Sequence, residues 1–116
     1  MLQEAQTGRL VAVTDETFAE TVLASDRPVV VDFWAEWCPP CKIISRNLAE
    51  LAGEFGDQMV VATLNSDENP QTTRTYSVMS LPTLLVFRHG EVVASMVGSR
   101  PKSHLRSFLA TALPAR

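Results

Sequence analysis

The sequence predicts an α/β fold in which helices cover both faces of a mixed β-sheet. Short apolar runs rich in β-branched residues alternate with segments whose apolar residues recur at helical spacing, which favours parallel pairing of the early strands. Two apolar runs near the C-terminus are joined by the short turn Arg88–Gly90, so the strands that they form must be antiparallel. The chain has 116 residues, of which 46% are hydrophobic and 20% charged, a composition that suits one globular domain.

These patterns predict five strands and four helices in a single domain, residues 9–116, after a polar and flexible N-terminal arm, residues 1–8. The strands are expected at residues 10–13, 29–34, 59–64, 84–87 and 92–96. The helices are expected at residues 16–24, 41–55, 69–76 and 101–112. Thr14 or Asp15 can cap the first helix, and Pro101 suits the first turn of the last one.

The second strand and the second helix carry the clearest signals. Residues 29–34 form an apolar run with three consecutive valines, which is typical of a buried strand. Further along, apolar residues step by four, three and four positions and so share one helix face: Ile44, Leu48, Leu51 and Phe55. The two cysteines of the chain, Cys38 and Cys41, therefore lie where a buried strand ends and a helix begins.

This position favours thiolate chemistry. Unpaired N–H groups and the positive end of the helix dipole gather at a helix N-terminus and favour an anion there. The thiolate is the form of cysteine that attacks disulfides. We expect Cys38, at the tip of the motif, to be the exposed nucleophile and Cys41, inside the first turn, to be the resolving thiol. In a protein that is not exported, Cys-X-X-Cys spacing indicates redox or metal chemistry more often than a structural disulfide.

Composition argues against several other functions. A net charge of −3 gives no electrostatic footprint for nucleic acid or an anionic membrane. Residues 1–9 lack the pattern of a signal peptide, and no apolar stretch approaches the ~20 residues of a membrane span. We therefore expect a cytoplasmic protein, with a monomer as the default oligomeric state. Neither His89 nor His104 has a spacing that joins the cysteines as metal ligands, so no metal is expected.

Several segments together resemble the thioredoxin family. Residues 31–42, with Trp37-Cys38-Pro39-Pro40-Cys41, look like its active-site segment, and residues 80–84 look like its cis-proline loop. Residues 87–92 and 97–98 resemble its closing hairpin, and the match runs in register from about Leu10 to Leu113. The resemblance implies the thioredoxin fold, a central mixed five-stranded sheet flanked by four helices. It also implies a thiol–disulfide oxidoreductase, a protein-disulfide reductase and electron carrier in cell redox homeostasis.

The resemblance assigns the roles of individual residues. Cys38 would attack a partner's disulfide and Cys41 would resolve the mixed disulfide, leaving a redox-active Cys38–Cys41 disulfide with no bound cofactor. The substrate surface would comprise Trp37, Pro39, Pro40, Leu81, Pro82 and Gly98, with Trp34 packed beside it. The partners would be disulfide-containing proteins and an NADPH-dependent thioredoxin reductase.

Two residues have a simpler interpretation as well. Asp32 can lie on an exposed strand edge, since aspartate is almost never buried unpaired; the resemblance implies instead that it is buried beneath the dithiol as the base for Cys41. Pro82 can simply open an edge strand. The resemblance implies that the Leu81–Pro82 bond is cis and exposes the backbone of Leu81 to an extended substrate.

The chain departs from the family pattern near the site. Pro39 replaces the usual glycine; it removes an N–H and stiffens the dithiol loop, so we expect a more reducing couple. Thr63 replaces a lysine usual beside the buried aspartate, which should raise the pKa of Asp32 further. Ser77 and Ser80 stand where glycines are common, so we interpret the chain as a divergent member.

Two other functions remain open at this point. The apolar surface around Trp37 and Leu81–Pro82 can serve a redox-independent protein-binding module. Two chains can also share an iron–sulfur cluster through their cysteines, although a cis-proline beside the thiols would crowd it.

Overall fold

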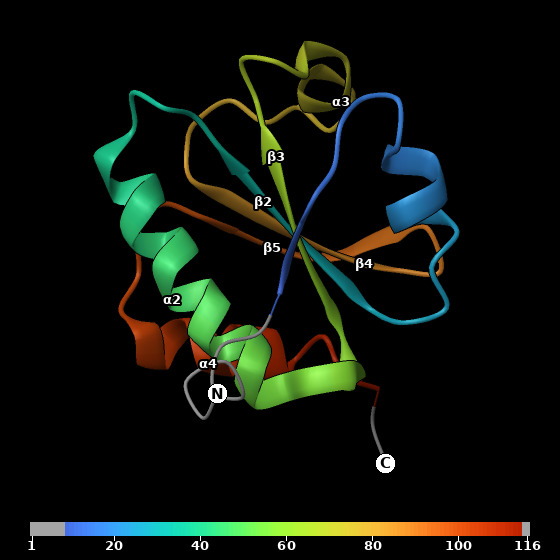
Figure 1. The fold of residues 1–116 in the computed structure, drawn as a ribbon, viewed down its shortest axis with the longest axis vertical. Coiled ribbons are helices and arrows are strands. Elements are labelled where there is room, and N and C mark those ends of the chain that lie inside the picture. The colour runs from blue at the N-terminus through green and yellow to red at the C-terminus, as the bar shows by residue number, and fades with distance from the viewer. Residues whose placement is uncertain (1–8, 115–116) are drawn as a thin grey trace.

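The structure is a computed structural model that describes residues 9–114, so the predicted arm and the last two residues lie outside the described residues. Five strands form one sheet in the order β1-β3-β2-β4-β5 (Figure 1). Their bounds are Leu10–Ala12, Val29–Trp34, Val60–Asn65, Thr83–Arg88 and Glu91–Val97 for β1 to β5. β3 is parallel to β1 and β2, whereas β4 is antiparallel to β2 and β5. The predicted mixed sheet and each of its five strands are confirmed.

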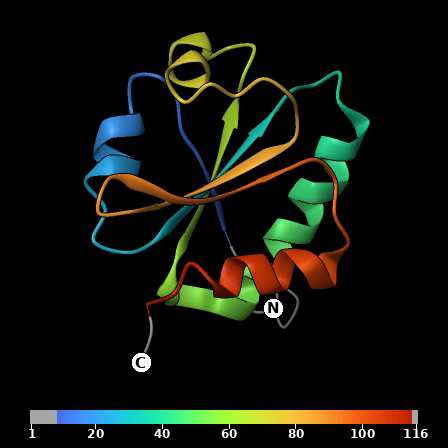
Figure 2. The same ribbon diagram turned by 180° about the vertical axis from the view of Figure 1, so that it is seen from behind.

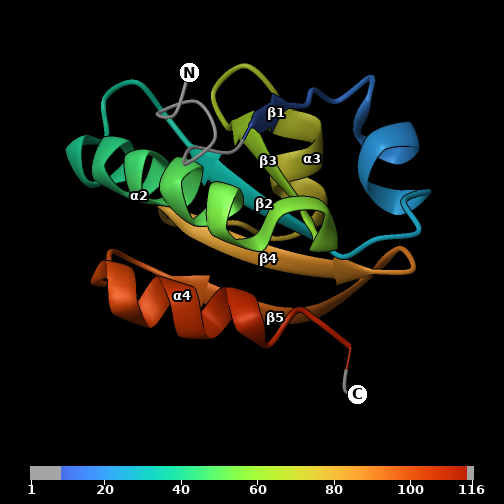
Figure 3. The same cartoon turned by 60° about the horizontal axis from the view of Figure 1, so that its bottom comes forward.

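Helices cover both faces of the sheet. α2 (Pro39–Phe55) and α4 (Lys102–Ala110) lie on one face, and Figure 3 shows them in front of the sheet with α3 (Pro70–Thr75) behind it. Alternate residues of β2 separate the two cores: Val30 packs with Leu48 of α2, while Val29 and Val31 pack on the other face. The two helices α2 and α4 are joined by the ion pairs Arg106–Glu54 and Lys102–Glu50.

The first helix differs from the prediction. A π-helical turn, η1 (Ala19–Leu23), forms instead of an α-helix over residues 16–24, and the N–H of Ala24 donates to the carbonyl of Ala19. The N–H of Thr14 donates to Oγ1 of Thr17 and the N–H of Thr17 donates to Oγ1 of Thr14. This reciprocal pattern is a capping box, so Thr14 caps the segment as predicted, and the N–H of Thr21 donates to the carbonyl of Thr17 in the turn that follows.

Candidate active site

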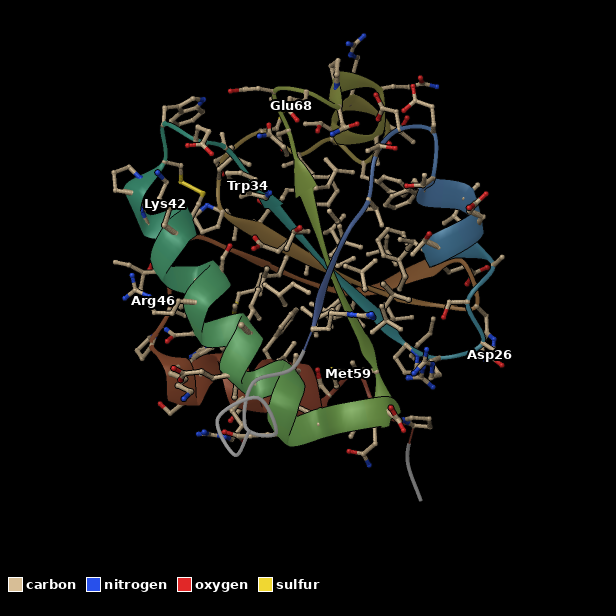
Figure 4. All side chains as sticks on the ribbon, in the orientation of Figure 1. Asp26, Trp34, Lys42, Arg46, Met59 and Glu68 are labelled. Carbon is tan, nitrogen blue, oxygen red and sulfur yellow. A yellow bond between two sulfur atoms is a disulfide. The ribbon has the colours of Figure 1, made fainter. Side chains whose placement is uncertain are left out.

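The dithiol lies at the start of α2. β2 ends at Trp34, a short loop follows, and Cys38 is the residue that precedes the first turn of α2. Cys38 and Cys41 form a disulfide with their Cα atoms 5.3 Å apart, and Figure 4 shows it at the N-terminal end of the helix, next to Lys42. The expected junction between a buried strand and a helix is thus confirmed.

The exposure of Cys38 differs from the prediction. Cys38 is only 3% exposed, while Cys41 is fully buried. The disulfide bonds the sulfur of Cys38 to that of Cys41 inside the first turn, and this bond holds the Cys38 side chain against the protein. Cys38 is still the more accessible of the two cysteines, but the expectation that it is exposed is wrong for the disulfide form.

Two prolines begin α2. Pro39 and Pro40 occupy its first two positions and have no N–H, so the first N–H of the helix belongs to Cys41. That N–H donates to the carbonyl of Cys38 over 3.0 Å. Because Pro39 leaves one donor fewer than a glycine would, the helix start stabilises a thiolate less than a Gly-Pro pair does.

Asp32 is a buried acid beside the dithiol helix. Its side chain is 0% exposed, so the alternative of an exposed strand edge is wrong. Oγ of Ser45 donates to its Oδ2 over 2.9 Å, whereas Oδ1 has no hydrogen-bond partner among the described residues. Burial raises the pKa of Asp32 from 3.8 to about 7, and the hydrogen bond from Ser45 lowers it in part. At neutral pH this carboxyl is therefore poised to take or give a proton.

The strands next to Asp32 bring no charge to it. Thr63 of β3 and Leu84 of β4 are its partners in the sheet register. Thr63 stands where a lysine would supply a positive charge. Because that charge is missing, nothing among the described residues offsets burial except the hydrogen bond from Ser45, and burial is the main cause of the raised pKa of Asp32. Ser45 lies four residues after Cys41 on α2, so the two side chains lie on the same helix face one turn apart. The carboxyl of Asp32 is consequently bonded to α2 one helical turn beyond Cys41.

The loop before β4 lies at the same end of the sheet. The Leu81–Pro82 bond is cis, as the resemblance implied, and β4 lies between β2 and β5, so the alternative of an edge strand is wrong. Pro82 is buried, and its carbonyl accepts from the N–H of Gly98 over 2.8 Å. The connection from α3 to β4 approaches the N-terminal end of α2 in two opposite views (Figures 1 and 2).

Exposed apolar side chains rim this end of the molecule. Trp37 is 66% exposed, and its Nε1 donates to Oδ2 of Asp67 over 2.9 Å, which ties the dithiol loop to the loop after β3. Met79, two residues before Leu81, is 91% exposed. Sequence reasoning missed Asp67, Met79 and Ser45. The spacing of Ser45 from Cys41 and the position of Met79 in the cis-proline loop were usable signals, whereas nothing in the sequence pairs Asp67 with Trp37.

Residues 9–114 carry no signature of a metal site or of a membrane-spanning helix. No group of three or more His, Cys, Asp or Glu side chains in this part of the chain is arranged to hold a metal ion. His89 and His104 are both exposed and lie apart from the dithiol in the fold. None of the described helices is long and apolar enough to cross a membrane.

Both sulfurs lie at one strand-to-helix junction and are bonded to each other, and a buried carboxyl that can hold a proton accepts a hydrogen bond from a residue one turn further along the same helix. A site of this kind makes and breaks disulfides, so the fold and the site define a thiol–disulfide oxidoreductase.

Comparison with known proteins gives the family. The thioredoxin family model matches residues 9–111. A thioredoxin from Streptomyces clavuligerus is 52% identical over 98 residues, which cover 84% of this chain and 91% of that protein. Thioredoxins from Acidithiobacillus ferridurans and Mycobacterium bovis are 48% and 41% identical, over 84% and 97% of this chain and 90% and 97% of their own. The chain belongs to the thioredoxin family, and it is a protein-disulfide reductase that acts through Cys38 and Cys41 on disulfide-containing substrates.

Proposed function

We propose that Cys38 is the attacking cysteine and Cys41 the resolving one. The Cys38 thiolate attacks one sulfur of a partner's disulfide; a mixed disulfide forms and the other partner sulfur leaves as a thiolate. Cys41 then attacks the sulfur of Cys38, which releases the second partner thiolate and closes the Cys38–Cys41 disulfide. Two electrons pass to the partner. The observation that carries this assignment is the disulfide at the start of α2, with Cys41 buried deeper than Cys38.

Asp32 is the base in this scheme. Cys41 must lose its proton before it can attack, and the carboxylate of Asp32 takes that proton. Two observations support this role: the raised pKa of Asp32, about 7, and its hydrogen bond to a residue one helical turn from Cys41. A base whose pKa lies near the working pH is the most effective one for such a transfer.

An extended segment of the partner docks beside the dithiol. No backbone hydrogen bond among the described residues involves Leu81, so its N–H and C=O are free to pair with a strand of the partner. The surrounding substrate surface comprises Trp37, Pro39, Pro40, Leu81 and Gly98, and the buried Pro82 contributes through the cis bond that follows Leu81. We add Met79 to it, because a large apolar side chain that is almost fully exposed beside this loop can be buried by a partner.

The proposal also covers the source of the electrons, the oligomeric state and the cellular compartment. The Cys38–Cys41 pair is the redox centre without a further bound cofactor, and an NADPH-dependent thioredoxin reductase returns it to the dithiol form. The protein works as a monomer in the cytoplasm, where a reducing supply keeps dithiols available, and binds neither nucleic acid nor membrane. A net charge of −3 supports the last point. No observation favours the redox-independent binding module.

A coupled assay tests the docking surface. The oxidised protein, NADPH and a bacterial thioredoxin reductase are mixed with insulin, whose interchain disulfides serve as the protein substrate, and NADPH oxidation is followed. Met79→Asp is expected to raise KM for insulin about tenfold, since about 1.4 kcal/mol of apolar contact is lost. It should leave the reduction of a small aromatic disulfide unchanged, because a small molecule does not reach Met79.

Val93→Asp is the matched control. Val93 is 50% exposed on β5 and lies near the hairpin turn, at the opposite end of the sheet from the dithiol. It should leave both activities unchanged. Equal effects of the two substitutions on insulin, or no effect of Met79→Asp, would refute the docking surface, and an absence of NADPH oxidation would refute the reductase partner.

A further inference from the structure

A hollow of about 380 Å³ opens between α2 and β3, on the face of the sheet that carries Asp32. We call it the α2–β3 hollow; it is lined by Leu10, Trp34, Glu36, Lys42, Ser45 and Thr63. Trp34 lies two residues after Asp32 on β2 and points to the same face, and Thr63 is the neighbour of Asp32 across the sheet. The hollow is therefore adjacent to Asp32, although the acid itself is fully buried.

Ser45 links the α2–β3 hollow to Asp32. Its side chain lines the hollow, and its hydroxyl donates to Oδ2 of Asp32 over 2.9 Å. A hydroxyl can donate one hydrogen bond and accept two, so Ser45 can bond to Asp32 and to a water molecule in the hollow at the same time. Thr63 supplies the other hydroxyl of the lining, and no hydrogen bond joins it to Asp32 among the described residues.

The charged groups around this arrangement lie at its rim. Glu36, from the loop before α2, and Lys42, from the first turns of α2, form an ion pair of 3.5 Å, and both side chains are exposed. Cys41 lies one turn before Ser45 on α2, and the elements β1, β3 and β4 bring the uncharged Leu10, Thr63 and Leu84. Among the residues that line the hollow, Ser45 is thus the one that donates a hydrogen bond to the buried carboxyl.

We propose that Ser45 is a positioning residue that carries the proton of Asp32 to solvent through the α2–β3 hollow. The inference rests on the proposed role of Asp32 as the base for Cys41. Once Asp32 is protonated, its O–H donates its proton to Oγ of Ser45 while the Ser45 hydroxyl passes its own proton to a water molecule. The hydroxyl then turns back to Oδ2. One proton moves from the carboxyl to water, and no electrons are transferred.

The test measures the resolving step as a function of pH. A mixed disulfide between Cys38 and a chromophoric thiol is formed by rapid mixing, and release of that thiol by Cys41 is followed in wild type and in Ser45→Ala. We expect the pH midpoint of this rate to rise by about one unit in Ser45→Ala, because the carboxylate of Asp32 loses its hydrogen bond. Ser45→Thr, which keeps the hydroxyl, should restore the wild-type midpoint, and Thr63→Val should leave it unchanged.

Imidazole distinguishes two possible roles of Ser45: a path for the proton, or only a hydrogen bond to Asp32. Imidazole is small enough to enter the hollow and can accept the proton directly, so it should accelerate Ser45→Ala at neutral pH and leave the wild type unaffected. An unchanged midpoint in Ser45→Ala overturns the positioning role. A shifted midpoint without acceleration by imidazole overturns the path.

Asp32→Asn distinguishes the proposed role of Ser45 from the proposed role of Asp32 as the base for Cys41. If Asp32→Asn removes the pH dependence while Ser45→Ala behaves as wild type, the role of Ser45 fails and the base remains. If Asp32→Asn leaves the resolving step unchanged, the base itself is wrong, and the proposed path fails with it.

Discussion

Cys38→Ser is expected to lower protein-disulfide reduction at least about a thousandfold, while Cys41→Ser is expected to hold its partner in a stable mixed disulfide. The hydroxyl of serine is not ionised at neutral pH and does not attack a disulfide, so Cys38→Ser stops the reaction before its first step. In Cys41→Ser the first step is intact, but nothing displaces the partner from Cys38. The two variants should therefore fail at different points of the cycle.

Intact-protein mass spectrometry under non-reducing conditions detects the difference. After incubation with insulin, Cys41→Ser should gain the mass of an insulin chain, and Cys38→Ser should not. The double variant Cys38→Ser/Cys41→Ser is the control for a redox-independent role, because a binding module would keep its function without either sulfur. Capture of insulin by Cys38→Ser rather than by Cys41→Ser would reverse the two proposed roles.

Asp32→Asn is expected to change the pH dependence of stability. The pKa of Asp32 is about 7 in the folded protein and 3.8 in the unfolded chain. Between these values the folded state holds a proton that the unfolded state has released, so the free energy of unfolding falls as pH rises from about 4 to about 7. At about 1.4 kcal/mol per pKa unit, ionised Asp32 destabilises the fold by about 4 kcal/mol above pH 7.

Asp32→Asn should remove the part of the pH dependence of stability that Asp32 causes. Above pH 7, Asp32→Asn should be more stable than the wild type by about 1–3 kcal/mol, since an imperfectly bonded amide costs part of the gain. Urea unfolding at a series of pH values measures the difference between the two proteins, which isolates Asp32 from all other titrating groups. The difference should grow from pH 4 to pH 7 and then stay constant. A difference that does not vary with pH would show that Asp32 titrates normally.

The fold and the dithiol were predictable because both depend on local patterns. The apolar run of β2 and the helical spacing of Ile44, Leu48 and Leu51 are signals within a few residues of the chain, and they place Cys38 and Cys41 correctly. The burial of Asp32 was not predictable from local pattern. An aspartate in an apolar strand can lie on an exposed edge or in the interior, and only the resemblance to the family indicated the interior. The same is true of the cis bond before Pro82.

The errors concern features that local sequence signals do not encode. Thr14 and Thr17 cap the first helix as those signals indicate, but neither capping residues nor apolar spacing distinguishes the π-helical turn Ala19–Leu23 from an α-helix. Cys38 is less exposed than expected because its environment depends on the closed disulfide. Ser45 went unnoticed, although it lies one turn from Cys41, because its role appears only when β2 places Asp32 opposite it.

The reduction potential of the Cys38–Cys41 pair decides whether the protein reduces disulfides. The pair is equilibrated in glutathione buffers of defined ratio, and free thiols are trapped with an alkylating reagent that adds mass. We expect a potential below the cytosolic glutathione range of about −220 to −260 mV, and Pro39→Gly should raise it by about 10–20 mV by relaxing the dithiol loop. A potential of about −120 to −180 mV would instead mark an oxidant or isomerase, and the protein would then not be a disulfide reductant.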